Sequence, residues 1–410
     1  MSSVTSPRVY TGHGQTGNWA DRANWDGTIA PTADAAVLIP VSATLNGSFT
    51  ARIAMLLGQE TVTLNGALTT TSPGLCISFM VCNGATAVFT PTASLHDAGG
   101  IVVGADQNGV LLAQGNATAH ATLTTVSGKL GLNSGSSGTA TLSGAVWNNS
   151  QNFYAGLGGT GSLTVNNSGA LNVGTSFVVG CGTKSSGTVA ISAGGQVNVG
   201  TYAKIGGGDL SIVGGTGTVS VATGGTFSVA GPLKIASTSS LVLSGGTVNA
   251  PDTAVGLQVW ADGTLSGYGT VNATGFGISD AGTIRAAGGT LVLNGNISGT
   301  GQMQIADTST IKITGATIGH ATIAFTGHNA TLSLAHGATS QATLTGFAAG
   351  DSIVMPGIDA FSWNGTTDVL TLSSAGHAVE TLQFNGTYGT NPFALTQTTA
   401  GAVIAFSPHH

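Results

Sequence analysis

Charged side chains are scarce in this sequence. Asp, Glu, Lys and Arg together make up 6% of the 410 residues, against about a quarter in a typical soluble domain. Hydrophobic residues still amount to 41%, which is more than a disordered chain carries. The nine Lys and Arg residues form no basic cluster that could follow a phosphate backbone. We therefore expect a folded protein that does not bind nucleic acid.

Helix formers, cysteines and long apolar runs are equally rare. Glu occurs only as Glu60 and Glu380, whereas the abundant Thr and Val favour strands over helices. No stretch reaches the roughly 18 apolar residues that a membrane-spanning helix requires, so no transmembrane segment is expected. Three cysteines do not make a disulfide framework. We interpret Cys76, Cys82 and Cys181 as small apolar residues.

Glycine is abundant, with 66 residues, and it marks a repeat in the middle of the chain. Each copy has three short strands of alternating apolar residues, separated by turns in which Gly and Asn can adopt a positive φ. Four clear copies begin at Gly138, Gly161, Gly187 and Gly217. Their first strands carry the apolar pairs Leu163 and Val165, Val189 and Ile191, and Val219 and Val221.

This repeat predicts an all-β fold, namely a right-handed parallel β-helix (β-solenoid) with three short strands per coil. Equivalent strands of successive coils would pair in parallel about 4.8 Å apart. Inward Val, Leu and Ile would form the core, and outward Thr, Ser and Asn would form polar ladders. A single coil cannot bury its own apolar face, so stacking must supply the stability. The alternative is a β-sandwich of antiparallel hairpins, which a recurring three-strand unit disfavours.

Changes in the residue pattern along the chain divide it into three segments. Residues 1–45 are predicted to form an N-terminal strand and an aromatic cap, because an uncovered solenoid end would be a template for aggregation. Residues 46–340 carry the repeats. Residues 341–410 form a C-terminal β-rich region, in which Asn364–Gly365 and Asn385–Gly386 are turn signals between alternating strands. In the cap, Trp19 and Trp25 have the alternative interpretation of a sugar-binding platform.

Residues 10–40 resemble the opening of bacterial extracellular β-helix proteins, including autotransporter passengers, which often begin W-T-G…W…NW…G-x-P…V-x-I-P. Here the first aromatic residue is Tyr10 instead of Trp. The matching residues are Trp19, Asn24, Trp25, Pro31, Val37, Ile39 and Pro40. The central repeats are similar to those of the same passengers, although the series of strands that builds their membrane barrel is missing. The resemblance implies a bacterial surface protein and is not specific for any activity.

The segment GFAAGDS, which contains Asp351, is similar to C-terminal regions of alphaproteobacterial surface proteins. Those proteins are commonly exported by type I secretion with an uncleaved apolar C-terminus. The N-terminus, MSSVTSPRVYTGHG, lacks the basic and apolar regions of a Sec signal. The resemblance therefore implies a secreted, extracellular or cell-surface location with a secretion signal within residues 341–410.

The acidic residues are dispersed and predict no active site. No Asp–Asp or Asp-x-Asp pair occurs, so no catalytic or cofactor-binding residue is predicted and the protein is not expected to be an enzyme. A polysaccharide lyase or hydrolase is the less favoured alternative, because distant residues can meet on neighbouring coils. Asp209 in a glycine-rich corner and Asp351 are the weak candidates for a single Ca²⁺.

The sequence as a whole predicts an extracellular structural protein that self-assembles with copies of itself into a surface fibre, S-layer or biofilm matrix. Low charge removes most of the repulsion between neighbouring copies. Residues 2–10 could serve as a strand donated to a neighbour. The alternative is an adhesin or glycan-binding module for cell-surface polysaccharide, with Trp19, Trp25 and Trp147 as the candidate binding residues.

Overall fold

The computed structural model describes residues 7–72, 77–207, 214–389 and 392–407. The regular secondary structure of these residues is almost entirely β, and the helical segments among them are two 3-10 turns, η1 (Arg22–Asn24) and η2 (Asp26–Thr28). The predicted all-β class is therefore confirmed. The chain divides into two compact units, Met1–Ser228 and Val229–His410. This division falls inside the segment 46–340, and the boundaries expected near residues 45 and 340 stay predictions.

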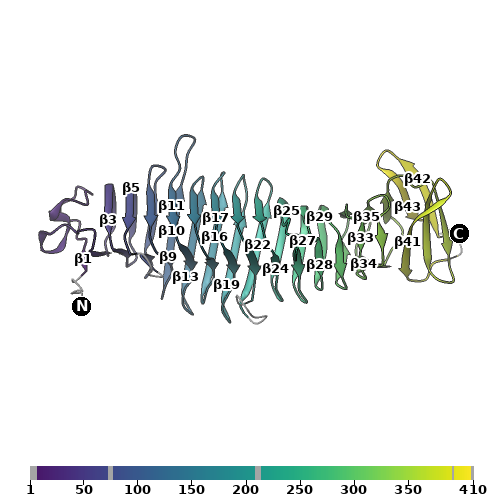
Figure 1. The fold of residues 1–410 in the computed structure, drawn as a ribbon, viewed down its shortest axis with the longest axis horizontal. Coiled ribbons are helices and arrows are strands. Elements are labelled where there is room, and N and C mark those ends of the chain that lie inside the picture. The colour runs from purple at the N-terminus through teal and green to yellow at the C-terminus, as the bar shows by residue number, and fades with distance from the viewer. Residues whose placement is uncertain (1–6, 73–76, 208–213, 390–391, 408–410) are drawn as a thin grey trace. The chain divides into compact units, whose positions relative to one another are not determined.

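One parallel sheet of unit 1, here called the A sheet, is built from short strands (Figure 1). Strands that are adjacent in this sheet come from successive repeats of the sequence, and each adjacent pair is parallel. In order these strands are β1 (Arg8–Val9), β2 (Ala36–Ile39), β4 (Ile53–Leu56), β6 (Phe79–Val81), β9 (Gly100–Val103), β12 (Ser127–Leu130), β15 (Phe153–Ala155), β18 (Ser176–Val179) and β21 (Tyr202–Ile205).

The other parallel sheet of unit 1, the C sheet, consists mostly of two rows of strands. It begins with β3 (Ala43–Ala51) and β5 (Thr61–Thr70), and β5 pairs with a strand of each row. One row contains β7 (Thr86–Phe89), β10 (Asn108–Gln114), β13 (Ser137–Ser143), β16 (Thr160–Asn166), β19 (Ser186–Ile191) and β22 (Thr216–Ala222). The other contains β8 (Ser94–Asp97), β11 (Thr122–Thr125), β14 (Val146–Asn149), β17 (Ala170–Val173), β20 (Gln196–Val199) and β23 (Thr226–Val229).

The register of these strands confirms the sequence repeat. Gly161 lies directly opposite Gly138 on one side and Gly187 on the other. The glycine is required here, because a Cβ on Gly161 would lie 2.0 Å from the backbone nitrogen of Gly156. The apolar residues that follow, such as Leu163, are fully buried. Period-two alternation therefore gave the correct inward face.

The outward face carries the predicted amide ladder. The Nδ2 of Asn172 donates to Oδ1 of Asn148 at 2.8 Å, and the Nδ2 of Asn198 donates to Oδ1 of Asn172 at 2.9 Å. The hydrogen bonds run from repeat to repeat, as the parallel register requires. Burial of Cys82 also agrees with the sequence interpretation, whereas Cys76 lies outside the described residues.

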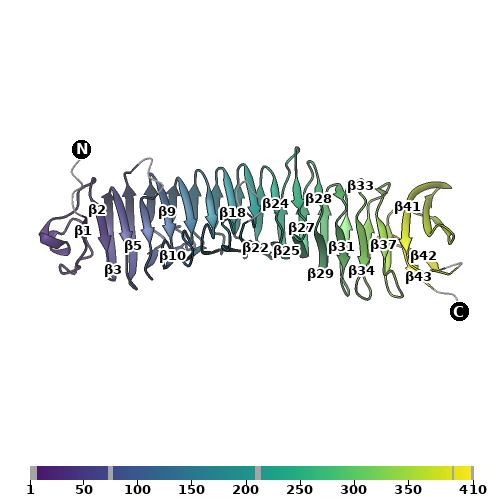
Figure 2. The same cartoon turned by 90° about the horizontal axis from the view of Figure 1, so that it is seen from below.

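Unit 2 begins with the same kind of parallel pairing (Figure 2). Its short strands are β24 (Leu233–Ile235), β26 (Leu257–Val259), β28 (Ile278–Asp280), β30 (Ile297–Gly299), β33 (Thr317–Ile318) and β36 (Thr339–Ser340). Its longer strands are β25 (Ser240–Asn249), β27 (Thr264–Asn272) and β29 (Thr283–Asn294). Two rows follow, β31 (Gln302–Ile305), β34 (Thr322–Phe325) and β37 (Thr343–Thr345), and β32 (Thr310–Ile313), β35 (Thr331–Leu334) and β38 (Ser352–Met355).

The last part of unit 2 is antiparallel. The strands β39 (Ala360–Asn364), β40 (Val369–Ser374) and β41 (His377–Asn385) form a meander, and β42 (Phe393–Thr398) pairs with β43 (Gly401–Phe406). The Asn364 turn signal is confirmed, since the Oδ1 of Asn364 accepts the N–H of Thr366 at 3.0 Å. The turn at Ala375–Gly376, where both residues have positive φ, was not predicted.

Candidate functional site

Aromatic rings pack together in the N-terminal segment of unit 1. Trp25 contacts Tyr10 and Trp19 edge to face, with ring centroids 5.2 and 4.7 Å apart. The Nε1 of Trp25 donates to the backbone carbonyl of Trp19 at 2.8 Å. Trp19 in turn lies 5.1 Å from the ring of Phe49 on β3. These contacts fix the segment against the beginning of the C sheet.

The same segment occupies the first strand edges of unit 1. The backbone N–H of Val9 on β1 donates to Oδ1 of Asp26 at 3.0 Å, and that of Asn46 on β3 donates to the carbonyl of Gly17 at 2.9 Å. Arg8 and Val9 pair with β2 of their own chain. Residues 8–10 are thus engaged within their own chain and residues 2–6 lie outside the described residues, so donation of residues 2–10 to a neighbour stays a prediction.

The tryptophans proposed as glycan platforms are buried. Trp19 and Trp25 have 6% and 2% of their surface exposed, and Trp147 on β14 has none. The Nε1 of Trp147 donates to Oγ1 of Thr125 at 2.9 Å inside the core. A ring without an exposed face cannot stack on a sugar, so the structure argues against this role for all three.

Of the two candidate ion ligands, the structure describes Asp351. Asp351 is buried, and its two carboxylate oxygens accept the backbone N–H groups of Ala330 at 3.0 Å and Ala348 at 2.9 Å. It therefore fastens two turns. Asp209 lies outside the described residues. No group of three or more His, Cys, Asp and Glu side chains that could hold a metal ion occurs among the residues that the structure describes.

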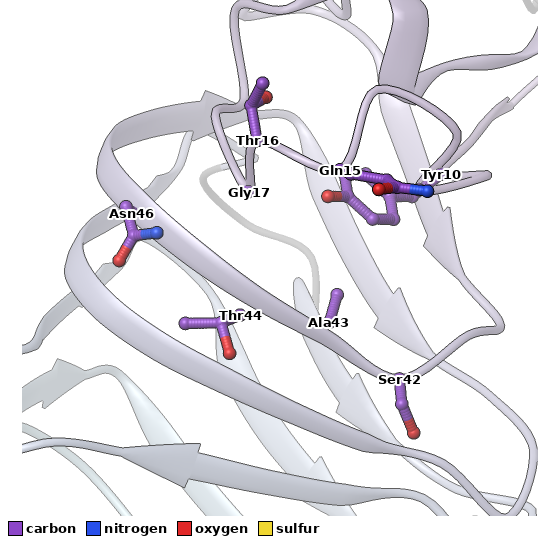
Figure 3. A pocket seen from close by; sticks show the side chains of 9 residues that line it. Tyr10, Gln15, Thr16, Gly17, Ser42, Ala43, Thr44 and Asn46 are labelled. Carbon is purple, nitrogen blue, oxygen red and sulfur yellow. The ribbon is translucent and has the colours of Figure 1, made fainter.

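A hollow of about 320 Å³ lies beside the aromatic rings, between the loop of residues 12–17 and the start of β3 (Figure 3). Its walls carry hydroxyl and amide groups and no charged side chain. The residues that line it are Tyr10, Gly12, Gln15, Thr16, Gly17, Ser42, Ala43, Thr44 and Asn46. Such a surface offers hydrogen bonds to a neutral ligand.

Carboxylates behind the hollow orient two of its hydroxyl groups. The Oγ1 of Thr16 donates to Oδ2 of Asp21 at 2.8 Å, and the Oγ of Ser42 donates to Oε2 of Glu60 at 2.5 Å. The sequence resemblance had already singled out Tyr10, because a Tyr stands where related openings have Trp. That substitution adds a hydroxyl group, which was the available signal for a polar site here.

Three buried carboxylates were missed by the sequence interpretation. Asp97 accepts both the Thr70 and Ser78 hydroxyls on Oδ1, and its Oδ2 has no partner among the described residues. Burial raises the pKa of Asp97 and of Glu380 above the usual range. The Oε1 of Glu380 accepts the backbone N–H of Ser340 at 3.1 Å and ties β41 to β36.

Asp280 is the most perturbed of these groups. It is fully buried at the end of β28, between Val259 and Gly299 of the neighbouring strands. Its Oδ1 accepts the N–H of Gly282 at 3.0 Å, and its Oδ2 has no partner within the described part of the chain. Desolvation by burial therefore raises the pKa of Asp280 to about 6. Strand alternation alone places all three side chains on the inward face. Asp97, Asp280 and Glu380 each lie two residues from a buried apolar residue of the same strand.

Among the described residues, no helix has the length and apolar character needed to span a membrane. In comparisons with known proteins, no family model and no curated protein matches this chain.

Proposed function

We propose that the chain is a right-handed parallel β-helix with three short strands per coil. The support comes from unit 1, where β16, β17 and β18 follow one another along the chain and pair with β13, β14 and β15. A connection that returns to a parallel strand of the same sheet is almost always right-handed. The segments 1–45, 46–340 and 341–410 are the cap, coils and C-terminal region of this proposal.

We further propose that the protein is an extracellular structural protein that assembles with copies of itself into a surface fibre, S-layer or biofilm matrix. The observation that carries this proposal is the amide ladder of Asn148, Asn172 and Asn198. An Asn amide has two donor hydrogens and two acceptor lone pairs. Asn172 uses one donor and one lone pair within the ladder, so it keeps one of each for a partner.

The ladder therefore presents a donor and an acceptor once per repeat, at the strand spacing of about 4.8 Å. A second copy of the ladder has the same spacing and is also uncharged, so two such faces can exchange hydrogen bonds without repulsion. The strand edges at the beginning of unit 1 are occupied by Asp26 and Gly17. The proposed contact is therefore lateral, between faces, at this part of the molecule.

Electron microscopy of the purified full chain tests the assembly. We expect ordered assemblies of the wild type at low salt. Val146→Glu combined with Gln196→Glu adds two negative charges on the outward side of β14 and β20, the strands that carry Asn148 and Asn198, and these should keep the protein dispersed. At about 1 M salt the charges are screened beyond about 3 Å, so the assemblies should return. Val146→Gln, which leaves a neutral Gln at both positions, is the matched control.

Two results would contradict this proposal. A wild type that stays monomeric at all concentrations would remove self-assembly. Assembly of the double Glu variant that equals that of the Gln control would exclude this face as the contact.

We propose a secreted location for the same protein, with export through type I secretion and a signal in residues 341–410. The support is the resemblance of GFAAGDS and the apolar strand β43 to the ends of such proteins. The test compares the full chain with a chain that ends at residue 340, both produced in a bacterium with a type I exporter. Only the full chain should reach the medium or the cell surface, and equal export of both would place the signal elsewhere.

A further inference from the structure

We infer that the hollow between Tyr10 and Asn46 binds one neutral sugar residue. The inference concerns a site on unit 1 that takes no part in the lateral contact proposed above. It holds whether or not the protein assembles, because its parts belong to a single chain.

Tyr10 supplies the first argument. Only 3% of its surface is exposed, and its ring is held by the edge-to-face contact with Trp25. Its hydroxyl group is directed into the hollow (Figure 3). A phenol hydroxyl can both donate and accept a hydrogen bond. It therefore offers a hydroxyl group of a ligand in the hollow a fixed partner.

Asn46 supplies a second oriented group. Its Oδ1 accepts the Nδ2 of Asn65 at 3.1 Å, which turns its own amide NH₂ group away from Asn65. That NH₂ group lies beside Gly17, since a Cβ on Gly17 would be 3.0 Å from Nδ2. The hollow therefore has a fixed N–H donor opposite the Tyr10 hydroxyl. Two fixed groups on opposite walls can orient a polyhydroxylated ring.

The electrostatics of the hollow select a neutral ligand. No charged side chain lines it, and the nearest acidic groups, Asp21 and Glu60, stand behind Thr16 and Ser42. These two negative charges repel a phosphate, a sulfate or a uronic acid. A divalent cation would need several direct oxygen ligands, usually including carboxylates, and no carboxylate lines the hollow. Sugar hydroxyls, which both donate and accept, match the lining.

The size and the loop conformation fit a single ring. A volume of about 320 Å³ is at the lower end of the roughly 300–1,000 Å³ typical of small-molecule sites. Gln15 has a φ of 55°, which is costly for a residue of its type. Gly17 has a φ of 62°, and a Cβ there would lie 2.2 Å from the carbonyl oxygen of Thr44. The loop is thus drawn tightly onto β3, with the Gln15 amide at the rim.

Saturation-transfer NMR and calorimetry on the full chain test the site. The probes are the methyl glycosides of glucose, galactose, mannose, rhamnose and N-acetylglucosamine, with glucuronic acid as the charged comparison. We expect at least one neutral glycoside to bind and glucuronic acid to bind at least tenfold more weakly. Loss of one neutral hydrogen bond reduces affinity about two- to tenfold. Tyr10→Phe, which keeps the ring contact with Trp25, should show that reduction.

Two further variants make the result interpretable. Asn46→Asp keeps the acceptor for Asn65 and removes the NH₂ donor, so it should also weaken binding, and thermal melting verifies that both variants fold. Tyr268→Phe removes a phenol hydroxyl from an exposed residue of unit 2 and should leave binding unchanged. The inference is overturned if no neutral glycoside binds, if glucuronic acid binds as well, or if folded Tyr10→Phe and Asn46→Asp bind as the wild type does.

Discussion

The carboxyl group of Asp280 makes the stability of unit 2 depend on pH. Its ordinary pKa of 3.8 is raised to about 6 in the folded protein, because burial disfavours the charged form and the single backbone N–H of Gly282 offsets this in part. The carboxyl packs directly against Gly301, since a Cβ there would lie 2.4 Å from the carboxyl carbon. Asp280→Asn replaces the carboxyl by a group of the same shape that cannot ionise.

The direction and size of the effect follow from proton linkage. Below pH 3.8 the carboxyl is protonated in both states and costs nothing. Between pH 3.8 and 6 the unfolded chain ionises while the folded chain keeps its proton, so the free energy of unfolding falls as the pH rises. Above pH 6 the loss is complete. A difference of one in pKa corresponds to about 1.36 kcal/mol. A pKa raised from 3.8 to about 6 therefore lowers the free energy of unfolding by about 3 kcal/mol at pH 7.

Urea unfolding followed by far-ultraviolet circular dichroism, at several pH values from 3.5 to 8, measures this effect. We expect Asp280→Asn to differ from the wild type by a constant amount near pH 3.5 and to gain about 3 kcal/mol relative to it by pH 7. Asp262→Asn, the same substitution at an exposed turn of unit 2, is the matched control. A stability difference for Asp280→Asn that does not change between pH 4 and pH 7 would refute the reasoning.

Three other substitutions or reactions test separate features of unit 1. Gly161→Ala should destabilise the protein by about 3 kcal/mol, because its Cβ would overlap the backbone nitrogen of Gly156. Thermal melting of the variant checks this, and an unchanged melting temperature would contradict it. Asn172→Ala removes two ladder hydrogen bonds and should cost about 1–2 kcal/mol in the same melts, whereas an unchanged midpoint would show that the ladder adds no stability. Burial raises the pKa of the Cys82 thiol, so iodoacetamide should label the folded protein more slowly at Cys82 than at the half-buried Cys181; peptide mass spectrometry decides the order, and faster labelling of Cys82 would contradict its burial.

The repeat could be predicted because it rests on local rules. Period-two alternation identified inward residues such as Leu163, and the stacked glycines marked positions where a Cβ meets backbone. The merging of two short strands into β5 was not predicted. It occurs because Asn65 and Gly66 stack directly on Asn46 and Gly47 of β3, so the chain passes this corner without leaving the sheet.

The candidate site was less accessible from the sequence. The tryptophans of the cap were identified, but their burial follows from tertiary contacts with Phe49 and Tyr10. The hollow depends on how closely the loop around Gly17 approaches β3, which no local pattern specifies. Asp280 is different, because its position two residues after Ile278 already placed it on the inward face. At this position strand alternation is sufficient to predict that a charged residue is buried.

The in-register stacking of unit 1 bears on how such a protein can change its length. Gly161 and Gly187 occupy equivalent places in consecutive repeats. Deletion of residues 161–186 would therefore bring Gly187 opposite Gly138, with strands of matching apolar phase on every side. Unequal recombination within the gene can in this way add or remove whole repeats, and each product inherits a complete set of neighbours. The length of such a stack is then inherited, and it changes in steps of one repeat.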